Sequence, residues 1–420
     1  MKSLISSILF VLAFTNCMIS QPAISIQGRN ILVNGTNYYI RGVCYNPVAI
    51  GDDRFDPLDF SYINQDTQLM AQAEINTVRT YVPILDDNVL DKFANAGIKV
   101  IIGFPNYDDT FRYPDINSGN YLNYINAHKN HEAILMWELG NEYNYHPEWF
   151  NNDIKNWYTI LNNAAAAIHN ADPNHPVSTA HGEVPASDVI AACPNVDVWG
   201  MNVYRWDDPS AAITEFALRS SKPCYLSESG ADRFNNTEGH ENQQQQADAD
   251  IAIWNRTKIN LDKCSGITFF SFVDEWWKSG NVGIHDASGF SMSVPYDNFA
   301  NEEWWGIVDI NRNVTLAYNT LKVAFSGFTG GIENSRIQKG SLLFPNPAEN
   351  RVNIKLSEPI SEDLVLTIST ITGNEVVSSP VQVSGREIEV SLYKFRLPVG
   401  IYIISAVGKT VRTRNLLIKN

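Results

Sequence analysis

Apolar runs rich in β-forming residues alternate with longer helical stretches from Tyr38 to about Phe328. This alternation is the pattern of a parallel sheet whose strands are joined by crossover helices. Eight such runs fit a (β/α)8 barrel, the TIM barrel, better than an open doubly wound sheet, which usually carries a glycine-rich phosphate turn that is not found here. The fold class predicted for this part of the chain is therefore α/β. The predicted strands are Tyr39–Tyr45, Thr77–Val82, Lys99–Phe104, Ile134–Leu139, Val177–Ala180, Val198–Val203, Cys224–Ser227 and Ile267–Phe272.

The composition changes after Phe328. Residues 329–340 predict a linker, and residues 341–420 alternate apolar and polar side chains with no helical period. About seven short strands with turn signals between them predict a small all-β sandwich domain. At the other end of the barrel region, an Asn-Gly turn signal after Val33 predicts a hairpin over residues 24–33 that closes the bottom of the barrel.

The charge of the chain limits its partners. The formal net charge is −15 over 420 residues, and residues 341–420 are slightly basic, so the acidity belongs to the barrel. Nucleic acid requires a basic patch, and none stands out, so a nucleic-acid partner is not predicted. Anionic membrane surfaces are disfavoured for the same reason.

The first twenty residues have the organisation of a secretory signal peptide. Residues 1–20 combine a basic Lys2, an apolar core over residues 4–14 and small or polar residues before Gln21. The apolar core is too short to span a bilayer, and no later window is long enough, so the mature protein is predicted to have no transmembrane segment. Two processing routes stay open. Cleavage near Ser20 would leave a catalytic domain over residues 21–328, and lipidation would use Cys17.

Cleavage would leave four cysteines, which allow three pairings in an exported protein. One disulfide and buried free thiols both stay open, and the sequence does not choose among the pairings. None of the spacings is typical of a zinc site, so no metal is predicted. These cysteines are Cys44, Cys193, Cys224 and Cys264.

The slightly basic tail resembles the C-terminal sorting domain of the type IX secretion system of Bacteroidetes. The matching pieces are residues 344–348 (FPNPA), 399–402 (VGIY) and the closing residues 416–420 (LLIKN). The resemblance implies that the tail is an export address and that the type IX machinery is a partner. It also implies a secreted protein or one attached to the outer-membrane surface. A carbohydrate-binding or spacer sandwich is the alternative.

Two carboxylates stand where the active site of a barrel lies, at the C-terminal ends of the strands. Glu142 follows the fourth predicted strand and Glu228 ends the seventh. These strands face each other across the barrel mouth, so the two carboxyl groups can flank one bond. A separation of about 5–5.5 Å would be the geometry of a retaining glycosidase, in which one group protonates the leaving oxygen and the other attacks the anomeric carbon.

The neighbours of the two glutamates suggest their roles. Arg79 ends the second predicted strand, and its guanidinium close to Glu228 would keep that carboxylate ionised as the nucleophile. Tyr204 could donate a hydrogen bond to the same carboxylate. Glu142 has no obvious cation beside it in the sequence and would be the acid/base. Asn141 could bind the 2-hydroxyl of the sugar.

Other polar residues near these strand ends are weighed as structural or as substrate-binding. Glu138 lies lower on the fourth strand and is predicted to be structural. Asp274 and Glu275 could be subsite residues or loop caps.

Aromatic side chains also follow the strands, where they could stack on the apolar faces of sugar rings. Tyr45, Trp206 and Trp276 are the candidate substrate-binding rings. The remaining candidates are Trp277, Trp304 and Trp305. The alternative is that these rings pack the rim of the barrel.

The barrel resembles glycoside hydrolases of clan A, whose acid/base and nucleophile lie on strands four and seven. Residues 39–45, 75–79, 94–98 and 197–206 are similar to the β-1,3-glucanosyltransferase family, and the same stretches, with residues 139–142 and 228–232, also resemble family 2. The resemblance implies an exported retaining β-glycosidase that acts on a polysaccharide, with a β-glucan as the expected substrate and no cofactor. The alternatives are a transglycosylase, a family 2-like exo-β-glycosidase, a β-mannanase and a non-catalytic carbohydrate-binding protein.

Overall fold

The structure of the protein is a computed structural model. It describes residues 23–107, 112–205, 207–287, 297–326, 328, 341–370, 375–407 and 412–420. The expected signal peptide over residues 1–20 and the expected linker over residues 329–340 lie outside the described residues, as does Trp206.

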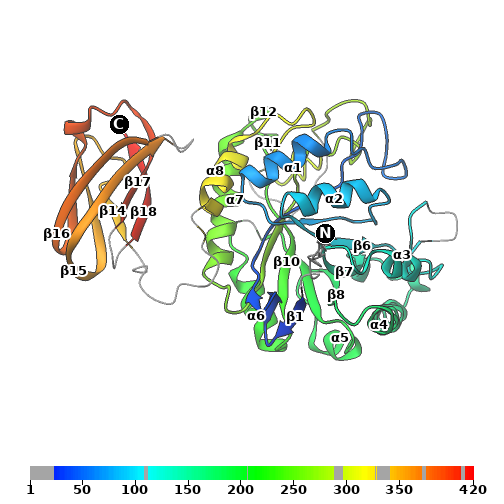
Figure 1. The fold of residues 1–420 in the computed structure, drawn as a ribbon. Helices are drawn as coiled ribbons and strands as arrows, with labels where there is room; N and C mark the ends of the chain where they lie inside the picture. Colours follow the sequence, from blue (N-terminus) through cyan, green and yellow to red (C-terminus); the bar gives the residue numbers. More distant parts are fainter. Residues whose placement is uncertain are drawn as a thin grey trace, which may run out of the picture.

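A closed parallel barrel forms the larger part of the molecule (Figure 1). Its strands follow one another around the barrel in the order β10-β13-β4-β5-β6-β7-β8-β9, so eight neighbouring strands close the sheet. The order confirms the predicted (β/α)8 architecture. The strands are β4 (Ile40–Cys44), β5 (Thr77–Arg79), β6 (Lys99–Phe104), β7 (Ile134–Asn141), β8 (Val177–Gly182), β9 (Val198–Asn202), β10 (Cys224–Ser229) and β13 (Gly266–Phe269).

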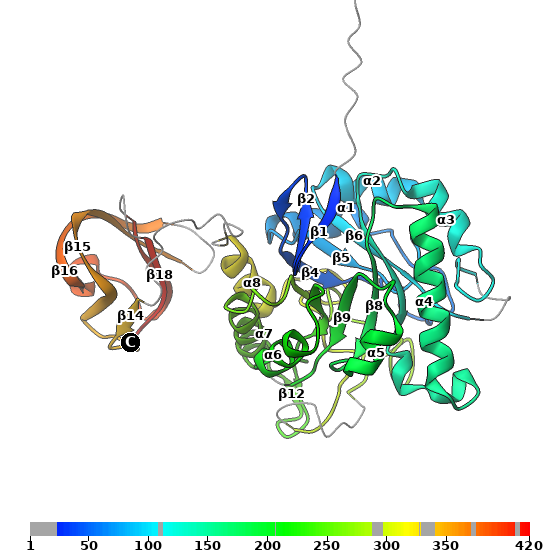
Figure 2. The same cartoon turned by 90° about the horizontal axis from the view of Figure 1, so that it is seen from below.

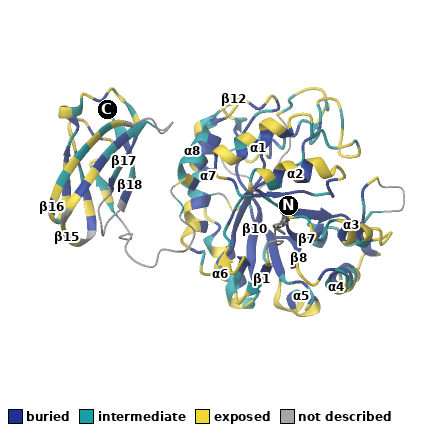
Figure 3. Cartoon of the chain, viewed as in Figure 1, coloured by how far each residue is buried: buried dark blue, intermediate teal, exposed yellow. Residues whose placement is uncertain are grey.

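Helices surround the barrel (Figure 2), and each of them contains buried residues (Figure 3). In α2, for example, Asp86 caps the N-terminus by accepting a hydrogen bond from the backbone N–H of Asn88, and Val89, Leu90 and Phe93 point into the core. The α-helices are α1 (Ile63–Gln72), α2 (Asp87–Asn95), α3 (Tyr121–His128), α4 (Ile154–Ala171), α5 (Ser187–Ala192), α6 (Ser210–Arg219), α7 (Gln243–Lys258) and α8 (Leu316–Ser326). Shorter elements are the 3-10 turns η1 (Tyr143–Tyr145) and η2 (Pro147–Phe150) and the two-stranded pair β11 (Phe234–Asn235) and β12 (His240–Glu241).

The N-terminal segment closes the lower end of the barrel. It forms the predicted hairpin from β1 (Ile24–Gln27) and β2 (Asn30–Val33) and adds a third strand, β3 (Thr36–Asn37), after the Asn-Gly turn. Both turn residues have positive φ angles, 53° at Asn34 and 75° at Gly35. Ile24 and Ile31 pack in one apolar cluster with side chains from the N-terminal halves of the barrel strands. That cluster contains Ile40, Ile101, Leu135, Met136, Val198 and Tyr225.

The C-terminal domain is an antiparallel β-structure with its own core, as the all-β prediction requires. Among its described residues, the strands are longer and fewer than the seven expected. β15 runs through 20 residues and β16 through 17, because a register shift between Lys355 and Ile360 interrupts their pairing without ending either strand. The elements are β14 (Leu342–Phe344), β15 (Arg351–Thr370), β16 (Glu375–Ser391), η3 (Leu392–Phe395), β17 (Gly400–Val407) and β18 (Arg412–Lys419).

Candidate active site

A polar cavity of about 540 Å³ lies at the C-terminal ends of the barrel strands. Its size falls within the range of about 300–1,000 Å³ typical of small-molecule sites. Asn141 and Asn202 are the last residues of β7 and β9, Glu228 is the residue before the end of β10, and loops beyond the strands supply the rest. The lining residues are Tyr81, Asn141, Glu142, Tyr145, Glu183, Asn202, Tyr204, Glu228, Phe270, Lys278, Ala300, Glu302 and Trp305.

Three donors converge on the carboxylate of Glu228. Arg79 Nη1 lies 2.9 Å from Oε1, Tyr81 Oη lies 2.8 Å from the same oxygen, and Tyr204 Oη lies 2.9 Å from Oε2. One cationic and two neutral donors fix the orientation of the carboxylate and stabilise its negative charge. The structure thus places Arg79 and Tyr204 beside Glu228, where the sequence predicted them.

The sequence interpretation missed Tyr81, although a signal for it was present. Arg79 ends β5 with its side chain inside the barrel, and Tyr81 follows two residues later. Residues two apart on an extended chain point to the same side. Once Arg79 is assigned to the interior, the same assignment follows for Tyr81.

The environment of Glu142 differs from that of Glu228. It directly follows β7 with a left-handed backbone, φ 56° and ψ 21°, which costs a residue other than glycine about 1–2 kcal/mol and is held here by the surrounding fold. Burial, together with the negative charge of Glu228, raises the pKa of Glu142 to about 7. A carboxyl group with a pKa near neutrality can hold a proton and also give it up, as an acid/base requires.

A cation that the sequence did not suggest lies near both glutamates. Lys278, from the loop after β13, lines the cavity, and its charge opposes the rise in the pKa of Glu142. Lys278 Nζ is 3.7 Å from Glu275 Oε2 and 3.6 Å from Glu302 Oε2. Glu142 has no cation beside it in the sequence, but the loop after β13 brings Lys278 into the same cavity.

Arg79 also organises the floor below the cavity. It is 1% exposed, so it acts through the residues that it binds and not by direct contact with a substrate. Its Nε donates to Glu138 Oε1 at 2.5 Å, and its Nη2 donates to Asn141 Oδ1 at 2.8 Å. Glu138 further accepts hydrogen bonds from Ser178 and Tyr225, which agrees with the structural role expected of it.

Asn141 lines the cavity, and both of the donors that reach it bind its carbonyl oxygen. Asn202 Nδ2 donates to Asn141 Oδ1 at 3.1 Å, alongside Arg79. With Oδ1 occupied, a hydrogen bond from Asn141 to a substrate hydroxyl would come from its Nδ2 group. The predicted contact to a sugar 2-hydroxyl stays compatible with this arrangement.

Tyr45 does not belong to the site, which corrects the prediction. Its side chain is 0% exposed, its hydroxyl donates to Asp66 at 2.7 Å, and its ring packs against Phe93 and Phe272, each at 5.8 Å between centroids. Val43 and Tyr45 share the outward face of β4, which contacts the helices, whereas Cys44 between them points toward Arg79. Tyr45 therefore stabilises the core and cannot stack on a sugar.

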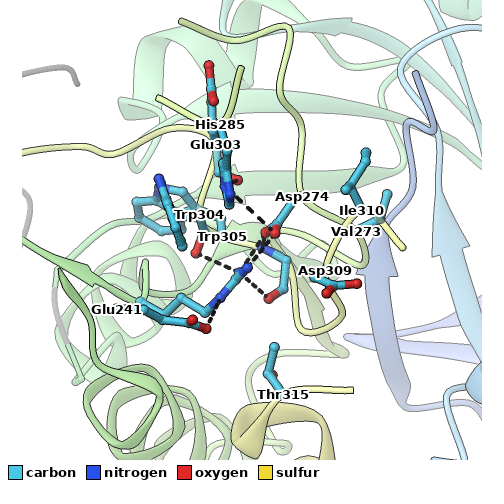
Figure 4. A network of polar contacts seen from close by, with 12 residues as sticks. Glu241, Val273, Asp274, His285, Glu303, Trp304, Trp305, Asp309, Ile310 and Thr315 are labelled. Atoms are coloured by element: carbon cyan, nitrogen blue, oxygen red, sulfur yellow. Dashed lines mark hydrogen bonds and ion pairs between the residues drawn. The ribbon is translucent and has the colours of Figure 1, made fainter. Parts of the chain in front are cut away.

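Trp276 is also misplaced by the sequence interpretation. It lines a second cavity of about 310 Å³, where its ring stacks on His285 at 4.9 Å. The same cavity is lined by Arg233, which forms ion pairs with Asp274 and Glu241. Figure 4 labels these two carboxylates together with His285 and Trp304. The loop after β13 turns so that Trp276 faces this second cavity while Lys278 faces the first.

Two further tryptophans of the rim, Trp304 and Trp305, separate in the same way. Trp304 lines the second cavity and Trp305 lines the first. Trp305 contacts Tyr204 edge to face, with 5.3 Å between ring centroids, and Phe270 lies 5.6 Å away. The aromatic wall beside Glu228 therefore consists of Tyr204, Phe270 and Trp305, of which Tyr204 and Trp305 were candidates from the sequence.

Neither a metal site nor a disulfide is present in the part of the chain that the structure describes. Among these residues, no group of three or more His, Cys, Asp or Glu side chains could hold a metal ion. The four described cysteines are buried free thiols, which is one of the two alternatives left open by the sequence. They are Cys44, Cys193, Cys224 and Cys264.

Comparison with known proteins shows to which family the barrel region is similar. Residues 13–303 match the profile of a family described as Glucanosyltransferase. The 1,3-beta-glucanosyltransferase gas5 of Schizosaccharomyces pombe is 29% identical over 243 residues, 50% of this chain and 47% of that protein. A beta-glucuronidase of Paenibacillus borealis is 25% identical over 236 residues, 50% of this chain and 38% of that protein. The chain thus spans less than half the length of either relative.

Solved structures share the fold. A GH2 beta-galacturonidase from Eisenbergiella tayi superimposes with a TM-score of 0.54 at 20% identity, covering 74% of this chain and 55% of that one. A beta-D-glucuronidase of Dictyoglomus thermophilum gives a TM-score of 0.53 at 17% identity, covering 74% and 54%. These similarities confirm the architecture expected from the resemblance to family 2.

The C-terminal domain matches the profile of a different family. Residues 342–420 match the profile of a family described as Secretion system C-terminal sorting domain. This confirms the resemblance predicted for the tail, so the protein carries an export address and is secreted or attached to the cell surface. Among the described residues, no helix combines the length and the hydrophobicity needed to cross a membrane.

Proposed function

The chain belongs to the glucanosyltransferase family, and from this premise we propose that it cleaves the β-linkages of an extracellular glucan, with β-1,3-glucan as the substrate, by a retaining mechanism. One observation carries the proposal. Glu142 and Glu228 line the same cavity in opposite environments, one with its pKa raised to about 7 and the other bound by Arg79, Tyr81 and Tyr204. Two carboxyl groups in such different surroundings suit the roles of acid and nucleophile.

The first step forms a covalent glycosyl-enzyme. A carboxylate oxygen of Glu228 attacks the anomeric carbon while the bond from that carbon to the leaving oxygen breaks. Glu142 gives its proton to the leaving oxygen, so the departing sugar is a neutral alcohol. Glu228 becomes a neutral ester and Glu142 becomes a carboxylate, so the total charge of the two groups does not change. The positive charge of Arg79 is still paired with Glu138.

The second step releases the sugar with the original stereochemistry. The Glu142 carboxylate takes a proton from water or from a sugar hydroxyl, whose oxygen attacks the anomeric carbon, and the ester bond to Glu228 breaks. Water gives hydrolysis and a sugar hydroxyl gives transglycosylation. Transfer is the second candidate activity, favoured by the family description and by the two relatives of Schizosaccharomyces pombe, which are both called 1,3-beta-glucanosyltransferases.

The expected location fits a polymeric substrate. We propose that residues 1–20 direct export and are removed, that residues 21–328 form the catalytic domain, and that residues 329–340 connect it to the sorting domain over residues 341–420. A polysaccharide too large to enter a cell requires an enzyme outside it. Degradation of such a polymer is therefore the proposed physiological role.

The substrate class can be tested with a panel of polysaccharides. We expect the purified protein to release products from β-1,3-glucan at a rate at least about tenfold above those on β-1,4-glucan, β-1,6-glucan and mannan, since a misfitted sugar loses contacts worth about 1–3 kcal/mol. Product lengths measured by chromatography separate hydrolysis, which only shortens chains, from transfer, which also lengthens them. If the protein released no product from any polysaccharide of the panel, that result would contradict the proposed function.

The pH dependence follows from the state of Glu142. Its protonated form is the one that donates, and its pKa is raised to about 7 from an ordinary value of 4.5, so activity is retained above pH 4.5 and lost as the pH rises through about 7. We expect kcat/KM on an oligosaccharide to fall about tenfold per pH unit on the alkaline side. A β-glycosyl fluoride, whose leaving group needs little protonation, is the control and should show a weaker decline. A fall centred near pH 4.5 would contradict this assignment.

A further inference from the structure

An exposed aromatic ring lies beside Glu142. Tyr145 follows it by three residues in η1, lines the active-site cavity and is 53% exposed. Small-molecule sites are lined mainly by apolar and aromatic side chains, with a few polar groups placed among them. Resting on the proposed function, we propose that Tyr145 and Glu183 form the subsite for the sugar on the leaving-group side of the cleaved bond, and that the same subsite holds the acceptor sugar during transfer.

The end of β8 supports one side of the Tyr145 ring. Gly182 is the last residue of that strand, and a Cβ atom placed on it would lie 2.2 Å from Cε2 and 2.5 Å from Cζ of Tyr145. The ring thus packs directly on the glycine backbone, and any side chain at position 182 would displace it. One side of the ring is covered by the chain, while more than half of the side chain stays open to the cavity and to solvent.

The loop that carries Tyr145 is fastened to the same strand. The Nδ2 group of Asn144 donates to the carbonyl oxygen of Gly182 at 3.1 Å, and the N–H of Gly182 donates to Asn144 Oδ1 at 2.8 Å. This reciprocal pair fixes the position of η1 relative to β8. A ring held in place before the ligand arrives loses little conformational entropy on binding, which favours its use as a subsite.

Glu183 supplies polar contacts next to the ring. It follows Gly182, lines the cavity, and receives hydrogen bonds from Arg205 Nε at 3.1 Å and from Arg205 Nη2 at 2.5 Å. A carboxylate has more acceptor sites than Arg205 occupies, so it can also accept hydrogen bonds from sugar hydroxyls. A ring and an oriented carboxylate match the two surfaces of a pyranose, an apolar C–H face and a hydroxyl edge.

The position of Tyr145 assigns it to the leaving-group side. Its hydroxyl lies in the field of Glu142 and Glu183, and burial together with these two charges raises the pKa of Tyr145 to about 12. The aromatic wall of Tyr204, Phe270 and Trp305 stands instead beside Glu228, which binds the anomeric carbon. Because the proton from Glu142 goes to the leaving oxygen, the sugar beyond that oxygen meets the residues next to Glu142.

The test compares two substrates that share the glycone but differ in the leaving group. A β-1,3-gluco-oligosaccharide places a sugar on the Tyr145 side, whereas the β-glycosyl fluoride of the same glycone places only a fluorine atom there. We expect Tyr145→Ala to lower the ratio of kcat/KM values, oligosaccharide over fluoride, at least tenfold, and Tyr145→Phe to keep it within threefold of the parent because the ring remains. The yield of transfer to an added oligosaccharide acceptor should fall in parallel in Tyr145→Ala.

Two further variants complete the test. Gly182→Ala should lower the same ratio, since its Cβ displaces the ring. Tyr393→Ala removes a tyrosine that is 78% exposed in the C-terminal domain and should leave the ratio unchanged. Thermal unfolding of each full-length variant checks that it is folded. Equal losses on both substrates, or no loss, in Tyr145→Ala would overturn the subsite while leaving the proposed function standing. A parent protein that cleaves neither substrate would overturn both.

Discussion

Replacing Glu228 with alanine is expected to lower kcat/KM on a β-1,3-gluco-oligosaccharide by about 10⁴- to 10⁶-fold, the range typical of removing a catalytic nucleophile. The reason is geometric. Glu228 is held by Arg79, Tyr81 and Tyr204, so its carboxylate is fixed in the cavity before a substrate binds. No other carboxylate among the described residues shares this set of donors, so none can replace it.

The chemistry of rescue distinguishes a nucleophile from a residue that merely supports the fold. In Glu228→Ala the space left by the carboxylate can admit azide, which would attack the anomeric carbon from the same side as Glu228. We expect azide to restore part of the activity on a β-glycosyl fluoride and to yield a glycosyl azide of the α configuration, as identified by NMR. A structural role would give no rescue and no azide product.

A matched substitution controls for the loss of a negative charge. Glu238→Ala removes a glutamate that is 45% exposed on the turn between β11 and β12. We expect this variant to keep at least half of the parent activity. If Glu228→Ala retained more than about one per cent of the parent activity while remaining folded by circular dichroism, the assignment of the nucleophile would be wrong, because losses for nucleophiles are far larger.

The barrel and its two central glutamates could be predicted because each depends on short-range patterns. One apolar run corresponds to one strand, and the residue that ends the run lies at the barrel mouth whatever the loops do. Glu142, Glu228, Arg79 and Tyr204 all reach the cavity or its floor for this reason. Their positions depend on strand order and direction, and on which alternate residues of each strand face the interior.

Tyr45 was wrongly assigned because the prediction placed it at a strand end without deciding which way its side chain points. Alternation along β4 puts Val43 and Tyr45 on the outer face and Cys44 on the inner one. A shift of one residue exchanges the two faces completely. The same alternation, started from Arg79, would have found Tyr81, so the missing information was which alternate residues face the interior.

The loop after β13 could not be predicted in the same way. Trp276 and Lys278 are two residues apart, yet they line different cavities, and Glu302 meets Lys278 from a distant part of the chain. No periodic pattern governs an irregular loop, so its side-chain directions follow from contacts made only in the folded state. Ion pairs within such a loop, for example Lys278 with Glu275, cannot be predicted from the patterns of strands and helices.

Replacing Glu142 with alanine is expected to produce a loss that depends on the leaving group. The protonated acid is needed when the departing oxygen is a poor leaving group, so kcat/KM on an oligosaccharide should fall about 10²- to 10⁴-fold. A β-glycosyl fluoride should lose far less in its first step. The alkaline limb near pH 7 should disappear from the oligosaccharide profile, because the group whose pKa burial raises to about 7 has been removed.

Azide gives the opposite stereochemical result in this variant. With Glu228 intact, the covalent glycosyl-enzyme still forms from the fluoride, and azide attacks it from the side where Glu142 stood, which yields a β-glycosyl azide. Glu148→Ala, a substitution on η2 at a side chain that is 54% exposed, is the matched control and should keep the parent pH profile. An α-glycosyl azide from Glu142→Ala, or an alkaline limb that persists without Glu142, would show that the two roles are exchanged or that another group supplies the proton. Because the two variants give products of opposite configuration, one NMR measurement on each assigns both carboxylates independently of the identity of the natural glucan.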